Sequence, residues 1–177
     1  MWMQLSDKNF TGVRKTAVLA VFLGAAIVLG IVERMFPLEV AIPGVRLGLP
    51  NVVILILLYL FLPSDVIIVV ILKCVLTTMF AGNLVSFAIG LTGSLLSFTV
   101  MSALIKTVSS RISQIGVSVV GSVFHNIGQI LMAGCILGNS AVVVFLPALL
   151  ISGVITGAVT GIAAKQLLSR IKAIDII

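Results

Sequence analysis

Long apolar segments, broken by short polar, glycine- or proline-containing stretches, run along almost the whole chain. Six such segments can be delimited, at residues 13–32, 52–62, 66–80, 84–105, 116–137 and 141–164. A membrane-spanning helix needs about 20 mostly apolar residues, and four of the six segments reach that length. The two short ones are expected to extend into their flanks or to meet a locally thinned bilayer. The pattern predicts an all-α integral membrane protein, with six transmembrane helices in one domain covering residues 1–177.

Composition supports this class of protein. Hydrophobic residues make up 60% of the chain and charged residues only 9%, against about 25% charged in a soluble domain. The net charge of +6 does not come from a basic cluster with interleaved aromatic residues, so nucleic acid is not an expected partner. We expect the lipid bilayer to be the main environment of the chain, and the sequence gives no reason to expect a cofactor.

The basic residues are distributed unevenly between the ends of the predicted helices. If the N-terminus is cytoplasmic, the segments on the inner side contain Lys8, Arg14, Lys15, Lys106, Arg111, Lys165, Arg170 and Lys172. The outer segments then contain only Arg34 and Arg46. Cytoplasmic loops of membrane proteins carry the excess of lysine and arginine, so both termini are predicted to be cytoplasmic.

The segment at residues 33–51 is the only long non-helical stretch that the pattern predicts. It contains three prolines and both arginines of the outer side, Arg34 and Arg46. Long loops in compact domains are usually functional or disordered. We therefore expect this external segment to cap a ligand site.

Two titratable residues lie deep inside apolar segments. Lys73 is near the middle of the third predicted helix, and His125 is at a similar depth in the fifth. Such groups are costly in hydrocarbon and by default mark a substrate or ion site. The alternative for Lys73 is a side chain that extends to the membrane surface. Because these groups are basic or neutral and never acidic, they favour an anionic or electron-rich ligand.

The fifth predicted helix also carries a polar stripe. Ser118, Ser122, His125 and Gln129 recur every three or four residues, so they share one helical face, with Asn126 beside it. We interpret this face as lining a ligand site. The alternative is that these residues only hydrogen-bond neighbouring helices.

Small residues recur at helical spacing in two other places. Gly153, Gly157 and Gly161 in the sixth predicted helix favour close packing inside the molecule over a dimer interface. In the first helix, Ala17, Ala20 and Gly24 form a strip that either packs internally or docks a partner helix.

Motifs for catalysis are missing from the sequence. Its five acidic residues, Asp7, Glu33, Glu39, Asp65 and Asp175, are isolated and lie outside the predicted spans. No carboxylate pair is present for acid–base work or for magnesium, no glycine-rich phosphate loop ends in Lys-Ser/Thr, and no His/Cys group has metal-ligand spacing. The chain is therefore not expected to be an enzyme, to use ATP by itself or to bind a metal.

Two stretches resemble a known family, PGVRLGLPN at residues 43–51 and GVSVVGSVFHNIGQILMAG at residues 116–134. They contain the patterns Leu-Gly-x-x-Asn and His-Asn-x-Gly-Gln. From about residue 13 to residue 165 the chain resembles bacterial membrane proteins named heptaprenyl diphosphate synthase component I, also called the Gx transporter family. That family is in turn similar to the substrate-binding S components of energy-coupling-factor transporters.

The resemblance implies a multi-pass protein of the bacterial plasma membrane with an S-component-like fold. It also implies a gating loop after the first helix and a small-residue motif in that helix that meets a partner. Here the motif runs from Ala20 to Gly24, with glycine where a second alanine is expected. The implied partners are a transmembrane coupling subunit and ATPase subunits.

The predicted function is therefore a substrate-binding subunit of such an importer, for a small anionic, isoprenoid-like or vitamin-like molecule. The expected binding residues are Arg46, Asn51, Lys73, Asn83, His125, Asn126 and Gln129. Arg46 and Lys73 would supply charge, and the other side chains oriented hydrogen bonds. The first alternative is a non-catalytic membrane component of heptaprenyl diphosphate synthesis, since chain elongation uses aspartate-rich motifs that are absent here. The second alternative is a structural partner in a membrane redox assembly.

Overall fold

A computed structural model describes residues 12–35, 48–81, 84–108, 111–138 and 140–173, and these residues are almost entirely helical. The elements are α1 (Gly12–Met35), α3 (Leu49–Leu60), α4 (Pro63–Ala81), α5 (Leu84–Val108), α6 (Gln114–Leu137), the short 3₁₀ helix η1 (Ser140–Phe145) and α7 (Leu146–Ala173). The described ranges contain no strand. The all-α prediction is thus confirmed for this part of the chain.

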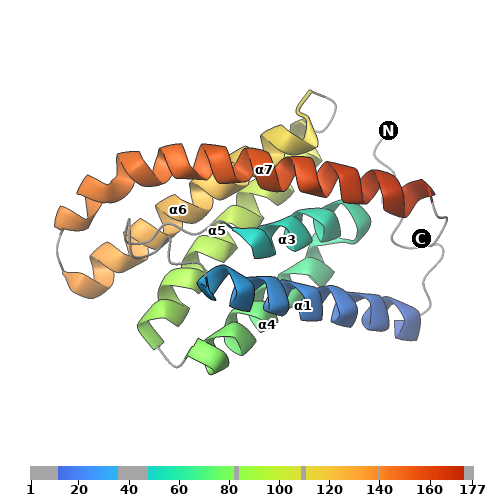
Figure 1. Ribbon diagram of the computed structural model, residues 1–177, viewed down its shortest axis with the longest axis horizontal. Helices are drawn as coiled ribbons and strands as arrows, with labels where there is room; N and C mark the ends of the chain where they lie inside the picture. The colour runs from blue at the N-terminus through green and yellow to red at the C-terminus, as the bar shows by residue number, and fades with distance from the viewer. Residues whose placement is uncertain (1–11, 36–47, 82–83, 109–110, 139, 174–177) are drawn as a thin grey trace.

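In Figure 1, α1, α3 and α7 lie roughly along the long axis of the molecule, whereas α4, α5 and α6 cross it obliquely. In that view α1 begins and α7 ends at the right, whereas α4 ends and α5 begins at the left. Five helices in the described ranges are long and apolar enough to cross a membrane, and α3 is a shorter apolar helix. This set is consistent with a multi-pass membrane protein.

Most helices extend beyond the predicted apolar segments. Pro50 and Pro63 each lie in the first turn of a helix, where proline is tolerated, so α3 and α4 begin earlier than predicted. Charged residues do not end α1 or α7, because a helix can continue past the hydrocarbon layer. The sixth predicted segment begins as η1 and becomes α7, which reaches Ala173.

The short helix α3 forms the centre of the bundle (Figure 1). It contacts α1, α4, α5, α6 and α7, and ten of its twelve residues are buried. Its start is fixed by Gly48, whose φ of 71° lies in the left-handed region that glycine adopts without strain. Helix α3 has 12 residues, about two turns fewer than a full crossing needs. Because it is covered on all sides, it can still contribute much of the apolar core.

Helix α6 is held between α5 and α7 by glycines. A Cβ added to Gly157 or Gly161 of α7 would lie 2.6 or 2.8 Å from a backbone Cα atom of α6. On the other side, a Cβ on Gly93 of α5 would lie 2.8 Å from the carbonyl oxygen of His125. The predicted close packing of the sixth apolar segment inside the molecule is confirmed.

Candidate functional site

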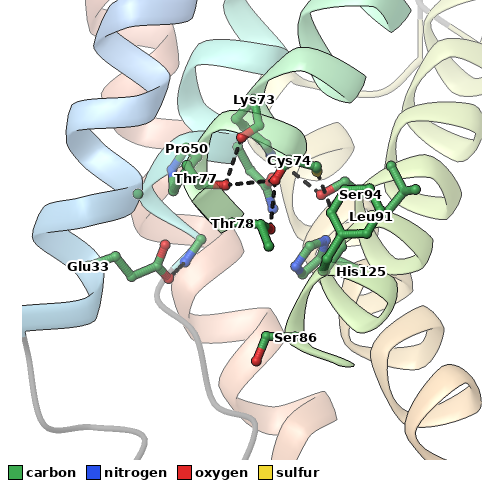
Figure 2. Close-up of a pocket in the computed structure, with 15 residues that line it drawn as sticks. Glu33, Pro50, Lys73, Cys74, Thr77, Thr78, Ser86, Leu91, Ser94 and His125 are labelled. Atoms are coloured by element: carbon green, nitrogen blue, oxygen red, sulfur yellow. Dashed lines mark hydrogen bonds between the residues drawn. The ribbon is translucent and has the colours of Figure 1, made fainter. Parts of the chain in front are cut away.

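A small cavity lies between α1, α3, α4, α5 and α6, near the ends of α1 and α4 and the starts of α3 and α5. About 60 Å³ of it is open to the centres of water molecules, which is room for roughly four to six waters or a few ligand atoms. It is lined by Gly30, Glu33, Gly48, Pro50, Asn51, Lys73, Cys74, Thr77, Thr78, Ser86, Phe87, Gly90, Leu91, Ser94 and His125. These residues are drawn as sticks in Figure 2.

Helix α4 supplies the ammonium group of the cavity. Lys73 is only 6% exposed, and its Nζ donates to Oγ of Ser94 on α5 at 3.4 Å. One turn later, the Thr77 hydroxyl donates to the Lys73 carbonyl oxygen at 2.7 Å, and Thr78 donates to the Cys74 carbonyl oxygen at 2.8 Å. The lysine therefore lies in the interior beside hydroxyl groups rather than at the membrane surface.

Helix α6 brings His125 to the same cavity from the opposite side. This residue is 7% exposed, and its ring carbon Cε1 would be 3.1 Å from a Cβ on Gly93. The absence of a side chain at Gly93 is what lets the imidazole lie against α5. The structure thus brings together Lys73 and His125, the two titratable residues that the sequence placed at one depth.

Glu33 of α1 also lines the cavity, and the sequence analysis missed it. Its Oε1 accepts a hydrogen bond from the backbone N–H of Gly48 at 2.5 Å, at the start of α3, where a carboxylate also interacts favourably with the helix dipole. The expectation that only basic or neutral groups face the site is therefore wrong. Glu33 lies three residues after Gly30, on the face of α1 that meets Thr77 and Pro50, and only the tertiary structure shows which face this is.

The other predicted binding residues are divided between the cavity and the helix contacts. Asn51 lines the cavity and is 8% exposed. Asn126 donates from Nδ2 to the Leu149 carbonyl oxygen of α7 at 2.7 Å, and Gln129 packs against Gly93; both are buried outside the cavity lining. Arg46 and Asn83 lie outside the described residues, as does most of the predicted capping segment.

The polar stripe on α6 does not form one ligand-facing surface. The hydroxyls of Ser118 and Thr160 of α7 are hydrogen-bonded at 2.9 Å, and Ser122 packs against Gly157. His125 and Gln129 instead face α5. Since α6 lies between two helices that cross it, residues on one face meet different neighbours at different depths.

The predicted docking strip is exposed on α1. Ala17, Ala20 and Gly24 are all exposed, and a Cβ added to Gly24 would meet none of the described atoms within 4 Å. The strip is therefore not used for packing within the described part of the molecule. Its role in binding a partner stays a prediction.

A metal centre is not evident in the described ranges. They contain no group of three or more histidine, cysteine, aspartate or glutamate side chains close enough to hold a metal ion. The charged and hydrogen-bonding side chains of the cavity lining include Glu33, Asn51, Lys73, Ser94 and His125.

These features are those of a helical protein of the multi-pass membrane type, with a small, partly open cavity that contains charged and polar side chains. The family model for heptaprenyl diphosphate synthase component I matches residues 22–167, and the chain belongs to this family. No curated protein and no solved structure matches the chain. The family resemblance drawn from the sequence is confirmed, whereas the similarity to S components stays a prediction.

Proposed function

We propose that this protein is the substrate-binding membrane subunit of an energy-coupling-factor-type importer. The observation that carries the proposal is the cavity, in which Lys73 and His125 are both buried at a place that lacks the dense packing found elsewhere on α6. A buried lysine is costly in a membrane. A bound small molecule that accepts hydrogen bonds from Lys73 offsets part of that cost. Ligand binding therefore accounts for a buried lysine at this position, whereas packing does not.

The basic residues at the helix ends indicate the side of the membrane toward which the cavity lies. Arg14 and Lys15 lie at the start of α1, Lys106 near the end of α5, and Lys165 and Arg170 in the last part of α7. The cavity lies toward the opposite end, beside the end of α1. With six crossings and cytoplasmic termini, the positive-inside rule orients the cavity toward the outside, as uptake requires.

The proposed ligand contacts are those of the lining residues. Lys73 supplies positive charge, while Asn51 and His125 supply hydrogen bonds from α3 and α6. Arg46 and Asn83 are retained as proposed contacts from the sequence alone. Asn126 and Gln129 support the position of α6 in this proposal and do not touch the ligand.

The second candidate is a non-catalytic membrane component of heptaprenyl diphosphate synthesis. The family name favours it, and the name implies a separate subunit that performs the chemistry. The five acids of this chain are isolated in sequence, so magnesium-dependent elongation would depend on that subunit.

Copurification distinguishes the two candidates. The full chain is purified from its native cells in a mild detergent, and its partners and bound small molecules are identified by native mass spectrometry. ATPase and coupling subunits, with a small molecule that is lost in Lys73→Met, are the expected result. A prenyl synthase chain in their place, with no dependence of ligand on Lys73, would establish the second candidate instead.

A further inference from the structure

The cavity presents charges of both signs. Glu33 contributes a carboxylate and Lys73 an ammonium, beside the imidazole of His125 and the thiol of Cys74. With His125 and Cys74 neutral, the described lining has a formal charge of −1 from Glu33 plus +1 from Lys73, which is zero. The described lining thus offers a ligand one ionised group of each sign.

The two charges belong to different walls. Glu33 is bonded to Gly48 where α3 begins, whereas Lys73 is bonded to Ser94 of α5. Figure 2 shows Glu33 and Ser94 on opposite sides of the group, with Thr77 and Thr78 between them. A single charged group of a ligand is therefore not expected to satisfy both walls.

The threonines make the difference between the walls larger. Both Thr77 and Thr78 donate their hydroxyl protons to carbonyl oxygens of α4. What each hydroxyl still offers is its oxygen lone pairs, which only accept. The Thr77 atom next to α1 is its methyl carbon Cγ2, which would lie 3.2 Å from a Cβ on Gly30, one turn before Glu33. The wall next to α1 thus accepts hydrogen bonds through the Glu33 carboxylate, and the threonine oxygens accept between the two walls. The wall at Lys73 donates hydrogen bonds.

We propose that the ligand is a small zwitterion, with its anionic group at Lys73 and its cationic group at Glu33 and the threonine oxygens. This inference rests on the proposed binding function. A diphosphate would meet one ammonium and one repelling carboxylate in a region of low dielectric, where repulsion is strong. The cavity of about 60 Å³ has room for a few ligand atoms, which suits a small molecule.

A matched set of probes tests the charge requirement. β-Alanine, propionate and propylamine share a three-carbon chain. β-Alanine carries both charges, propionate only the negative charge and propylamine only the positive charge. Inorganic diphosphate is the polyanion. Binding to the purified full chain is measured by titration calorimetry. Because each of the other probes lacks one of the two charged contacts, β-alanine should bind about tenfold or more tightly than each of the other three.

Two variants test which residue meets which charge. Glu33→Gln keeps an oxygen that can accept a hydrogen bond from Gly48 and removes the negative charge. The affinity for β-alanine should therefore fall about tenfold, while the affinity for propionate should not fall. Lys73→Met should lower the affinities for β-alanine and propionate and leave the affinity for propylamine unchanged. The control is Asp65→Asn, which removes the carboxylate that pairs with Lys15 at the other end of α4 and should change none of the affinities.

The zwitterion is overturned if propionate, propylamine or diphosphate binds as tightly as β-alanine. It is also overturned if Glu33→Gln weakens the binding of propionate and β-alanine equally, or if no probe binds. None of them contradicts the proposed function if a small molecule still copurifies with the wild type and is lost in Lys73→Met. The complete absence of a copurified molecule counts against the proposed function itself.

Discussion

The two sides of α6 use similar polar residues for different purposes. Toward α7, Ser118 bonds to Thr160 and Asn126 bonds to the Leu149 carbonyl oxygen, and the glycines of α7 leave no free space. Toward α4 and α5, His125 stands at a cavity that also contains Lys73. The difference teaches that a polar residue in an apolar helix is recognised as a binding residue by the space around it and not by its type.

The largest expected effect is on the packed side. Gly157→Val places a Cβ 2.6 Å from the Cα of Val119, a backbone atom that cannot rotate away. Overpacking of this kind costs about 1–3 kcal/mol or more, so we expect a large fall in the melting temperature or loss of folded protein. The control is Gly134→Val on α6, where an added Cβ meets none of the described atoms within 4 Å. A wild-type melting temperature for Gly157→Val would show that the α6–α7 contact is not tight.

The sequence predicted the helices well because length and apolar composition suffice to recognise them. It could not predict their ends, since proline in a first turn and charges beyond the membrane leave a helix intact, as at Pro50 and in α7. Lys73 and His125 were found because each is isolated in an apolar segment. Glu33 was missed because it lies one residue past the predicted span, where a charge is unremarkable.

The sequence could not predict that the polar residues of α6 divide between two neighbouring helices, for another reason. Helical period places Ser118 and His125 on one face, but it does not say which helix crosses that face at each depth. The glycine contacts of α5 and α7 decide this, and they depend on the tertiary arrangement. Sequence periodicity therefore gave the polar face, and packing determined its use.

On the cavity side, substitutions should affect binding more than folding. Lys73→Met and His125→Leu should each lower the affinity for the copurified ligand about tenfold or more. The losses of binding free energy should be non-additive if both residues contact one ligand. Removing the buried charge of Lys73 relieves a cost of about 3 kcal/mol on insertion scales, so the melting temperature should hold or rise. Ligand affinity and melting temperature are measured on the same samples.

The control for this pair is Lys106→Met, which removes a charge from the exposed end of α5. It should leave ligand affinity unchanged. Unchanged affinity in both Lys73→Met and His125→Leu would show that the cavity is not the binding site, and the comparison between the two sides of α6 would then fail.

A smaller effect is expected for Asn126→Ala. It removes the hydrogen bond to the Leu149 carbonyl oxygen, and such bonds between membrane helices contribute about 0.6–2 kcal/mol. The melting temperature should fall modestly while the affinity for the copurified ligand stays the same. Loss of affinity without loss of stability would move Asn126 from the packed side to the binding side.

The smallest effect on the isolated protein is expected on α1, whose outer face has neither dense packing nor a cavity. Gly24→Leu adds a side chain where none of the described atoms lies within 4 Å, so the melting temperature should stay at the wild-type value or rise slightly, because leucine favours helix more than glycine does. If Ala17, Ala20 and Gly24 dock a partner helix, the same variant should reduce the amount of coupling subunit that copurifies, because a small-residue contact depends on close approach of the backbones. Val159→Leu, at an exposed position of α7, is the matched control and should reduce neither quantity. A lower melting temperature for Gly24→Leu would mean that this face packs within the molecule, and unchanged copurification would mean that it does not dock the partner.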